Sequence, residues 1–188
     1  MFVKLDFEKV YQVEFEKRNE GFFYTVLRNG KKKRIKIQIA DKPQPLLDGA
    51  YNLAYGPVDR KGRIRDTVSV KHADYSMVFS TILKFAKAYL EWYPYRMVGL
   101  DGSTNSRAYV YFRMIKQNYD FLSERFDMYG IKYYMRVKRK GPELFENPFD
   151  TSDVACRYYE LLKDELYNNK DLEKMFNYFI FKNKEKYD

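Results

Sequence analysis

The segment Met97-Val98-Gly99-Leu100-Asp101-Gly102-Ser103-Thr104-Asn105-Ser106-Arg107 opens the stretch around which this 188-residue chain is organised. The apolar run from Met97 to Leu100 is too short for a helix and is typical of a buried strand. Glycine and polar residues then break the run, and Thr104 or Asn105 can cap a following helix. The pattern predicts a strand, a Gly-Ser-Thr turn and one long helix that ends at Gly130. The helix is indicated by apolar residues at three- and four-residue steps: Ala108, Tyr111, Phe112, Ile115, Tyr119, Leu122 and Phe126.

The first turn of this helix is a candidate anion site. A helix start offers unpaired backbone N–H groups and the positive end of the helix dipole. Hydroxyl side chains and the guanidinium of Arg107 surround that position. The alternative is ordinary capping, in which Arg107 reaches a carboxylate such as Asp101, and the pattern leaves both interpretations open. The candidate ligand-binding residues are Ser103, Thr104, Arg107 and Tyr111.

The composition indicates a globular chain with a basic surface. Hydrophobic residues make up 45% and aromatic residues 19% of the chain, which excludes a disordered protein. The formal net charge of +9 favours anionic partners such as nucleic acid or nucleotides, although a lysine-rich surface also keeps a small protein soluble. No apolar run reaches membrane-spanning length, so we expect no membrane association. The single cysteine, Cys156, excludes an intramolecular disulfide, and we expect a cytoplasmic protein.

Basic residues gather in three clusters: Lys31 to Arg34, Arg60 to Arg65, and Arg136 to Lys140. The tyrosines Tyr133 and Tyr134 lie close to the third cluster and could stack on bases. The clusters belong to three separate elements, however, and nothing in the sequence places them on one face. A scattered, solvated surface is the alternative to a nucleic-acid groove.

The first third of the chain is dominated by strand patterns. Phe22 to Arg28 and Lys33 to Ile39 flank Asn29-Gly30, a dipeptide typical of a two-residue type I′ hairpin turn. Further on, Asp74 can cap a helix from about Tyr75 to Tyr93, and its apolar stripe is Val78, Ile82, Phe85 and Tyr89.

The end of the chain carries helical patterns near Val154 to Tyr167 and Leu172 to Lys182, which predict an antiparallel helical pair. Strands that come first and helices that come later favour an α+β fold. We therefore expect a mainly antiparallel sheet with two long helices packed on it and a C-terminal helical pair. Residues 1–148 would form the α+β domain, and residues 149–188 a helical appendage packed on the same domain.

No motif in the chain predicts a reaction. The one histidine, His72, and the one cysteine, Cys156, have no activating partner nearby in sequence, so we expect no catalytic residue, no metal and no cofactor. An alternative comes from Asp48, Asp59 and Lys61, whose spacing occurs in metal-dependent nucleases, where two acids hold magnesium and a lysine stabilises developing charge. Asp59 falls in a predicted turn instead of a strand, which favours an exposed structural role.

The motif Gly102-Ser103-Thr104-x-x-Arg107-x-x-x-Tyr111 resembles the hallmark of a family of small, uncharacterised bacterial proteins of unknown function. Upstream, the segment Asn52 to Gly56, Asp66 and Asp74 are similar to that family's Asn-Leu-aromatic-Gly segment and its acidic positions. The resemblance covers about Tyr51 to Lys140. The chain departs from the family in having fewer arginines in the helix. The resemblance implies the fold and the importance of the Gly-Ser-Thr turn, and it implies no activity.

We expect a non-enzymatic protein that binds an anionic partner (phosphate, nucleotide or nucleic acid) at the Gly-Ser-Thr helix start. Arg107 would make the bidentate contact, and Ser103 and Thr104 would donate from their hydroxyls. The alternative is a protein–protein interaction module, such as one half of a toxin–antitoxin or phage-defence pair. In that case the tyrosine-rich surface and the C-terminal helices would form the interface to a partner protein or to a second copy.

Overall fold

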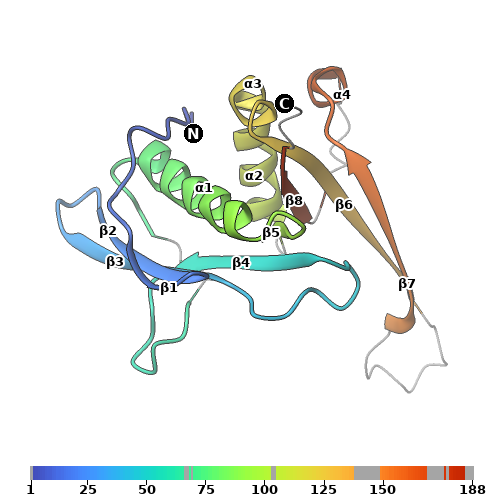
Figure 1. Ribbon diagram of the computed structural model, residues 1–188, viewed down its shortest axis with the longest axis horizontal. Helices are drawn as coiled ribbons and strands as arrows, with labels where there is room; N and C mark the ends of the chain where they lie inside the picture. The colour runs from blue at the N-terminus through green and yellow to red at the C-terminus, as the bar shows by residue number, and fades with distance from the viewer. Residues whose placement is uncertain are drawn as a thin grey trace.

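A computed structural model describes residues 2–65, 68, 70–102, 105–137, 149–168, 176 and 178–184. These ranges form one eight-stranded sheet with helices packed on it (Figure 1). The strands are β1 (Glu14–Lys17), β2 (Glu20–Val26), β3 (Lys32–Ile39), β4 (Ala50–Gly56), β5 (Met97–Asp101), β6 (Phe126–Val137), β7 (Phe149–Glu160) and β8 (Tyr178–Asn183). The helices are α1 (Tyr75–Trp92), α2 (Asn105–Gln117), α3 (Tyr119–Ser123) and α4 (Lys163–Asn168).

The sheet has the order β1-β2-β3-β4-β5-β8-β6-β7 and is mixed. β4 and β5 pair in parallel, because α1 carries the chain back across the sheet between them. The other neighbouring pairs are antiparallel. β8 is the last strand in sequence, yet it lies between β5 and β6, so the C-terminal segment closes the centre of the sheet.

The two faces of the sheet carry two cores. On the helix-covered face, alternate strand residues such as Ile37, Leu53, Leu100 and Phe179 pack against α1 and α2. On the opposite face a smaller cluster is also fully buried. Its members are Leu47, Ala50, Ile131, Tyr178 and Ile180.

The N-terminal segment runs along the helices and is held by side chains instead of by a neighbouring strand (Figure 1). Its backbone N–H groups at Lys4, Asp6 and Tyr11 donate to serine and threonine hydroxyls of α1 over 2.9 to 3.0 Å. The buried Asn118, at the end of α2, accepts from Leu5 N (2.8 Å) and donates to Val3 O (2.9 Å). These bonds satisfy backbone groups that no ladder reaches.

Two sequence predictions are confirmed in their main features. α1 spans Tyr75–Trp92, with Asp74 as its N-cap, and the predicted apolar stripe is buried. The hairpin forms from β2 and β3. Its turn differs from the expected type I′, because Leu27 N bonds to Lys31 O and Gly30 N to Leu27 O. Residues 28–30 therefore form a three-residue loop, which Gly30 closes with a φ of +78°.

The predicted fold class, by contrast, is wrong. The sheet is mixed, and the second long helix ends at Gln117. After the short α3 the chain turns into β6, so Gly130 lies within a strand instead of capping a helix. The expected C-terminal helical pair is replaced largely by β7 and β8, with the six-residue α4 between them. Long-range strand pairing decides these segments, because their apolar spacing suits a helix as well as a strand.

Candidate functional site

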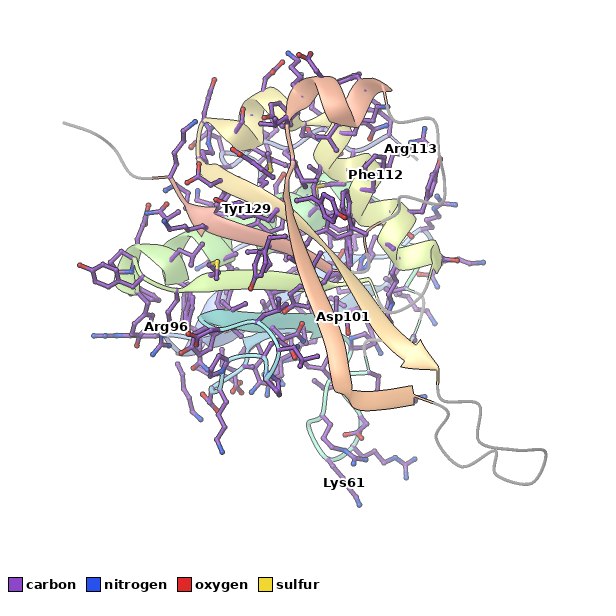
Figure 2. All side chains as sticks on the ribbon, turned by 90° about the vertical axis from the view of Figure 1, so that its right-hand side faces the viewer. Lys61, Arg96, Asp101, Phe112, Arg113 and Tyr129 are labelled. Carbon is purple, nitrogen blue, oxygen red and sulfur yellow. The ribbon has the colours of Figure 1, made fainter. Side chains whose placement is uncertain are left out.

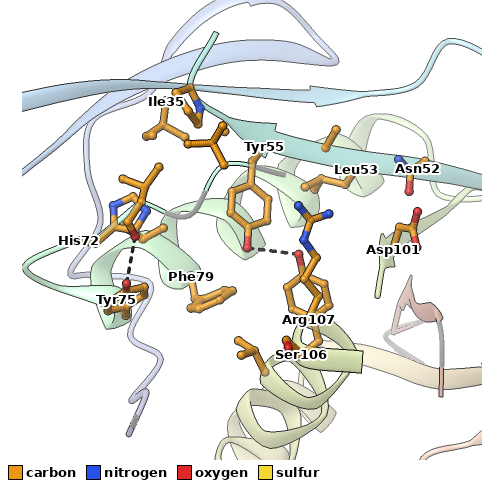
Figure 3. Close-up of a pocket in the computed structure, with 18 residues that line it drawn as sticks. Ile35, Asn52, Leu53, Tyr55, His72, Tyr75, Phe79, Asp101, Ser106 and Arg107 are labelled. Carbon is orange, nitrogen blue, oxygen red and sulfur yellow. Dashed lines mark hydrogen bonds between the residues drawn. The ribbon is translucent and has the colours of Figure 1, made fainter. Parts of the chain in front are cut away.

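A cavity of about 420 Å³ lies between β4, the first half of α1 and the start of α2 (Figure 3). Strand β4 and the first turns of α1 and α2 form most of the walls of this cavity. The alternation of β4 turns Leu53 and Tyr55 toward the helices, because Leu53 pairs with Ile39 and Tyr55 with Ile37. The other walls of the cavity come from the first turns of α1 and of α2. In α2, Arg107, Val110 and Tyr111 share one helix face. The volume lies within the roughly 300–1,000 Å³ typical of small-molecule sites.

One end of the cavity is polar. Asp101, at the end of β5, and Ser106 and Arg107, in the first turn of α2, line this end (Figure 3). Asp101 and Ser106 are exposed, and Arg107 is half-buried. Asn52 also lines it, and its side-chain oxygen accepts from the hydroxyl of Tyr178 at 3.3 Å.

Between the two ends, a pair of tyrosines lines the wall of the cavity. The hydroxyl of Tyr111 donates to the hydroxyl of Tyr55 over 3.3 Å and so links α2 to β4 (Figure 3). Burial raises the pKa of Tyr55 well above its ordinary value, and Tyr111 adds to the effect, whereas the positive charge of Arg107 lowers that pKa. Tyr55 is therefore a neutral hydroxyl at physiological pH.

The other end is largely apolar and holds the one histidine. His72 is buried, its Nδ1 lies 3.0 Å from Oγ1 of Thr25, and its ring meets Tyr75 edge-on. Burial lowers the pKa of His72, so the ring is neutral at pH 7. The residues beside it in the wall are Ile35, Val70, Val78 and Phe79.

His72 reaches this place because the chain before α1 pairs with the end of β2. Arg28 N bonds to Lys71 O and Ala73 N bonds to Val26 O, so residues 71–73 extend the sheet for one short step. Asp74 then starts α1, with its side chain accepting from Met77 N over 2.9 Å. This connection seats the imidazole against the cavity wall.

The structure brings two of the four predicted ligand-binding residues together. Arg107 and Tyr111 line the same cavity. Ser103 and Thr104 lie outside the described residues, as does Asp66. Sequence reasoning missed Tyr55 and His72 as cavity residues. The signal for Tyr55 was its place in the Asn52 to Gly56 segment, but His72 becomes a wall residue only through the pairing that precedes α1.

The first two basic clusters belong to different elements of the fold. Lys31 to Arg34 belongs to the β2–β3 hairpin, where Arg34 pairs with Glu16 and stacks over Phe22. Lys61 lies at the tip of a different loop, which projects from the body of the molecule (Figure 2). The third cluster lies in part outside the described residues, and its first residue, Arg136, belongs to β6.

The nuclease interpretation finds no support among the described residues. Asp59 holds its own turn, because its carboxylate accepts from Lys61 N, Arg63 N and Arg63 Nε over 2.8 to 3.0 Å. In the described part of the chain, no three His, Cys, Asp or Glu side chains gather so that they could hold a metal ion. Cys156 lies in β7, which replaces the start of the helix predicted near Val154 to Tyr167. None of the described helices is long and apolar enough to cross a membrane.

Comparisons with known proteins found one relationship. Searches of curated proteins and of solved structures found no match. A protein-family model matches residues 8–150, which include the described walls of the cavity and extend well beyond the resemblance seen in the sequence. The chain therefore belongs to the family of unknown function DUF6934.

Proposed function

We propose that this protein binds a small ligand through an anionic group of that ligand, without chemical conversion, at the polar end of the cavity. The observation that carries the proposal is that Arg107 and Tyr111 line one cavity of about 420 Å³. A guanidinium offers two parallel N–H donors to a carboxylate or phosphate, which makes it the preferred side chain for such groups. Tyr111 would flank the ligand with its ring, and Ser103 and Thr104 would donate from their hydroxyls.

The surroundings of Arg107 suit an anion. The first turn of α2 lines the same end of the cavity through Ser106 and Arg107, and a helix start favours negative charge. The formal net charge of +9 adds a long-range attraction for anions. Arg107 is half-buried, and this partial burial reduces the screening by salt that weakens interactions between exposed charges.

Isothermal titration calorimetry with inorganic phosphate, acetate and adenosine monophosphate tests this function. At least one probe is expected to bind, and Arg107→Gln is expected to weaken that binding at least tenfold. Arg113→Gln is the matched control, because it removes the same charge from an exposed position of the same helix. Binding that is equally strong in Arg107→Gln would refute the site, and binding of no anion of any kind would refute the function.

A further inference from the structure

The charged groups of the cavity narrow the class of ligand. Among the described residues that line the cavity, Asp101 and Arg107 are the two that carry charge at neutral pH, and they lie at the same end (Figure 3). We infer that the ligand is a free α-amino acid with a large apolar side chain. The inference rests on the proposed function, since the α-carboxylate would be the anion that Arg107 holds.

The two signs of charge explain why a zwitterion fits better than a simple anion. A phosphate at the polar end would meet Arg107 but also the carboxylate of Asp101, which repels it. An α-amino acid offers a carboxylate to the guanidinium and an ammonium to the carboxylate, and the two groups are only one carbon apart. The zwitterion therefore presents Asp101 and Arg107 each with an opposite charge.

The cavity walls beyond the polar end determine which side chain the bound amino acid carries. Beyond Arg107 the walls are apolar or neutral, with Val78 and Phe79 from α1 and Val110 from α2. Tyr55 is a neutral hydroxyl and His72 a neutral imidazole, so no ionised group faces the ligand there. Burying a charged ligand body at this end would leave it without an opposite charge among the described wall residues, whereas an aromatic or branched aliphatic side chain is favoured there.

The cavity is also deep enough to require a side chain. Its walls run from Asp101 at the polar end to His72 at the far end, with Tyr55 between them (Figure 3). Glycine would satisfy the charges but leave the apolar end unfilled. A nucleotide would place its polar base and ribose against apolar walls and a second negative charge beside Asp101. Both are expected to bind at least tenfold more weakly than phenylalanine.

Three probes of nearly equal shape test the contribution of each charged group of the ligand separately. Calorimetry with L-phenylalanine, 3-phenylpropionate and 2-phenylethylamine compares the zwitterion with an acid that lacks the ammonium and an amine that lacks the carboxylate. We expect phenylalanine to bind at least tenfold more tightly than either analogue. Arg107→Gln should weaken the binding of phenylalanine and of 3-phenylpropionate but leave the binding of 2-phenylethylamine unchanged. Asp101→Asn should weaken the binding of phenylalanine and of 2-phenylethylamine but strengthen the binding of 3-phenylpropionate.

Controls keep the result interpretable if a variant is unstable. Arg113→Gln should bind all three probes like the wild type, and circular dichroism of each variant shows whether it folds. Phe79→Leu is a second route, because it keeps both charges and reduces the aromatic area of the wall. This substitution should weaken the binding of phenylalanine while leaving the weak binding of glycine unchanged.

The failures of the two proposals can be told apart. If acetate, phosphate or 3-phenylpropionate binds through Arg107 and phenylalanine binds no more tightly than its deaminated analogue, the amino-acid inference is overturned and the anion site stands. If the amine binds as tightly as phenylalanine, both the inference and the role of Arg107 fail. If none of the anions and none of the three probes binds, both proposals fall.

Discussion

Gly99 of β5 lies directly beneath the aromatic ring of Tyr178, and a Cβ atom at position 99 would overlap with that ring and its hydroxyl oxygen. The two residues come from neighbouring strands on the face away from the helices, since Gly99 pairs with Ile180 and Tyr178 with Asp101. Tyr178 is almost fully buried, and its hydroxyl donates to Asn52 over 3.3 Å. The missing side chain at position 99 thus makes room for the largest member of the smaller core.

Gly99→Ala is expected to lower the free energy of unfolding by about 1–3 kcal/mol, the usual cost of overpacking a core. Chemical denaturation measures it. The control is the same change in a Tyr178→Leu background, where the shorter side chain leaves space for a methyl group, so the loss should be smaller. Equal losses in both backgrounds would show that the ring is not what excludes a side chain at position 99.

Asn118 gives a second prediction, on the attachment of the N-terminal segment. Its amide bonds to Leu5 N, Val3 O and Met114 O over 2.8 to 2.9 Å, and it is 7% exposed. Asn118→Ala would leave three backbone groups unpaired, and we expect a loss of roughly 3 kcal/mol or more, because each unpaired buried group costs about 1–3 kcal/mol.

Amide hydrogen exchange should localise this effect. The N–H of Leu5 is expected to exchange much faster in Asn118→Ala than in the wild type. Gln117→Ala is the matched control, since Gln117 makes one part-buried bond of 3.2 Å to Val3 N and its loss should cost less. Unchanged protection of Leu5 in Asn118→Ala would mean that packing, and not the amide, holds the segment.

The elements that sequence patterns predicted well are those with complete local signals. α1 has an N-cap, an apolar stripe and a proline just beyond its end, and the β2–β3 hairpin has alternation on both sides of a turn glycine. β8 also had a local signal, because Tyr178 to Phe181 is a short aromatic and β-branched run typical of a strand buried on both faces. Leu172, Met175 and Phe176 upstream of it suggested a helix that continued through the run. β7 is different, because its identity depends on pairing with β6 along its length.

Gly130 shows the limit of a single residue as a signal. A glycine after an amphipathic stretch is typical of a helix C-cap. In the structure Gly130 lies within β6, where a Cβ atom would overlap with the ring of Phe176. That contact joins residues far apart in sequence, which no local pattern reveals. The candidate site divides in the same way, since Arg107 and Tyr111 share a helix face but meet Tyr55 and His72 only in three dimensions.

His72 gives a prediction on pH. Burial lowers its pKa below the ordinary value of 6.5, so below that pH the unfolded chain binds more protons than the folded one. The stability from neutral His72 is therefore complete above about pH 6.5 and falls as the pH drops through the folded pKa. Between pH 7.5 and 5.5 the free energy of unfolding should decrease in the wild type and decrease less in His72→Gln.

This range separates the histidine from the carboxylates. The pKa of Glu20 is lowered by its hydrogen bond to Lys36, and that of Asp59 by the backbone N–H of Arg63. Their contributions are present above their ordinary values of 4.5 and 3.8 and are lost at lower pH. An equal slope between pH 7.5 and 5.5 in wild type and His72→Gln would contradict the role assigned to the imidazole.

The last prediction concerns Arg96, which joins the end of α1 to β4. Its Nη1 donates to the hydroxyl of Tyr89 over 2.6 Å, and its guanidinium carbon lies 4.2 and 4.5 Å from the ring centroids of Tyr93 and Tyr51. A lysine would keep the charge but lose the planar stacking on two rings, because an ammonium group has no flat face. Arg96→Lys is expected to lower the free energy of unfolding by about 1–2 kcal/mol. Arg63→Lys, in an exposed turn, should change it by less than about 0.5 kcal/mol, because exposed ion pairs contribute little. If both variants unfold at the wild-type denaturant concentration, the stacked guanidinium does not hold α1 against β4.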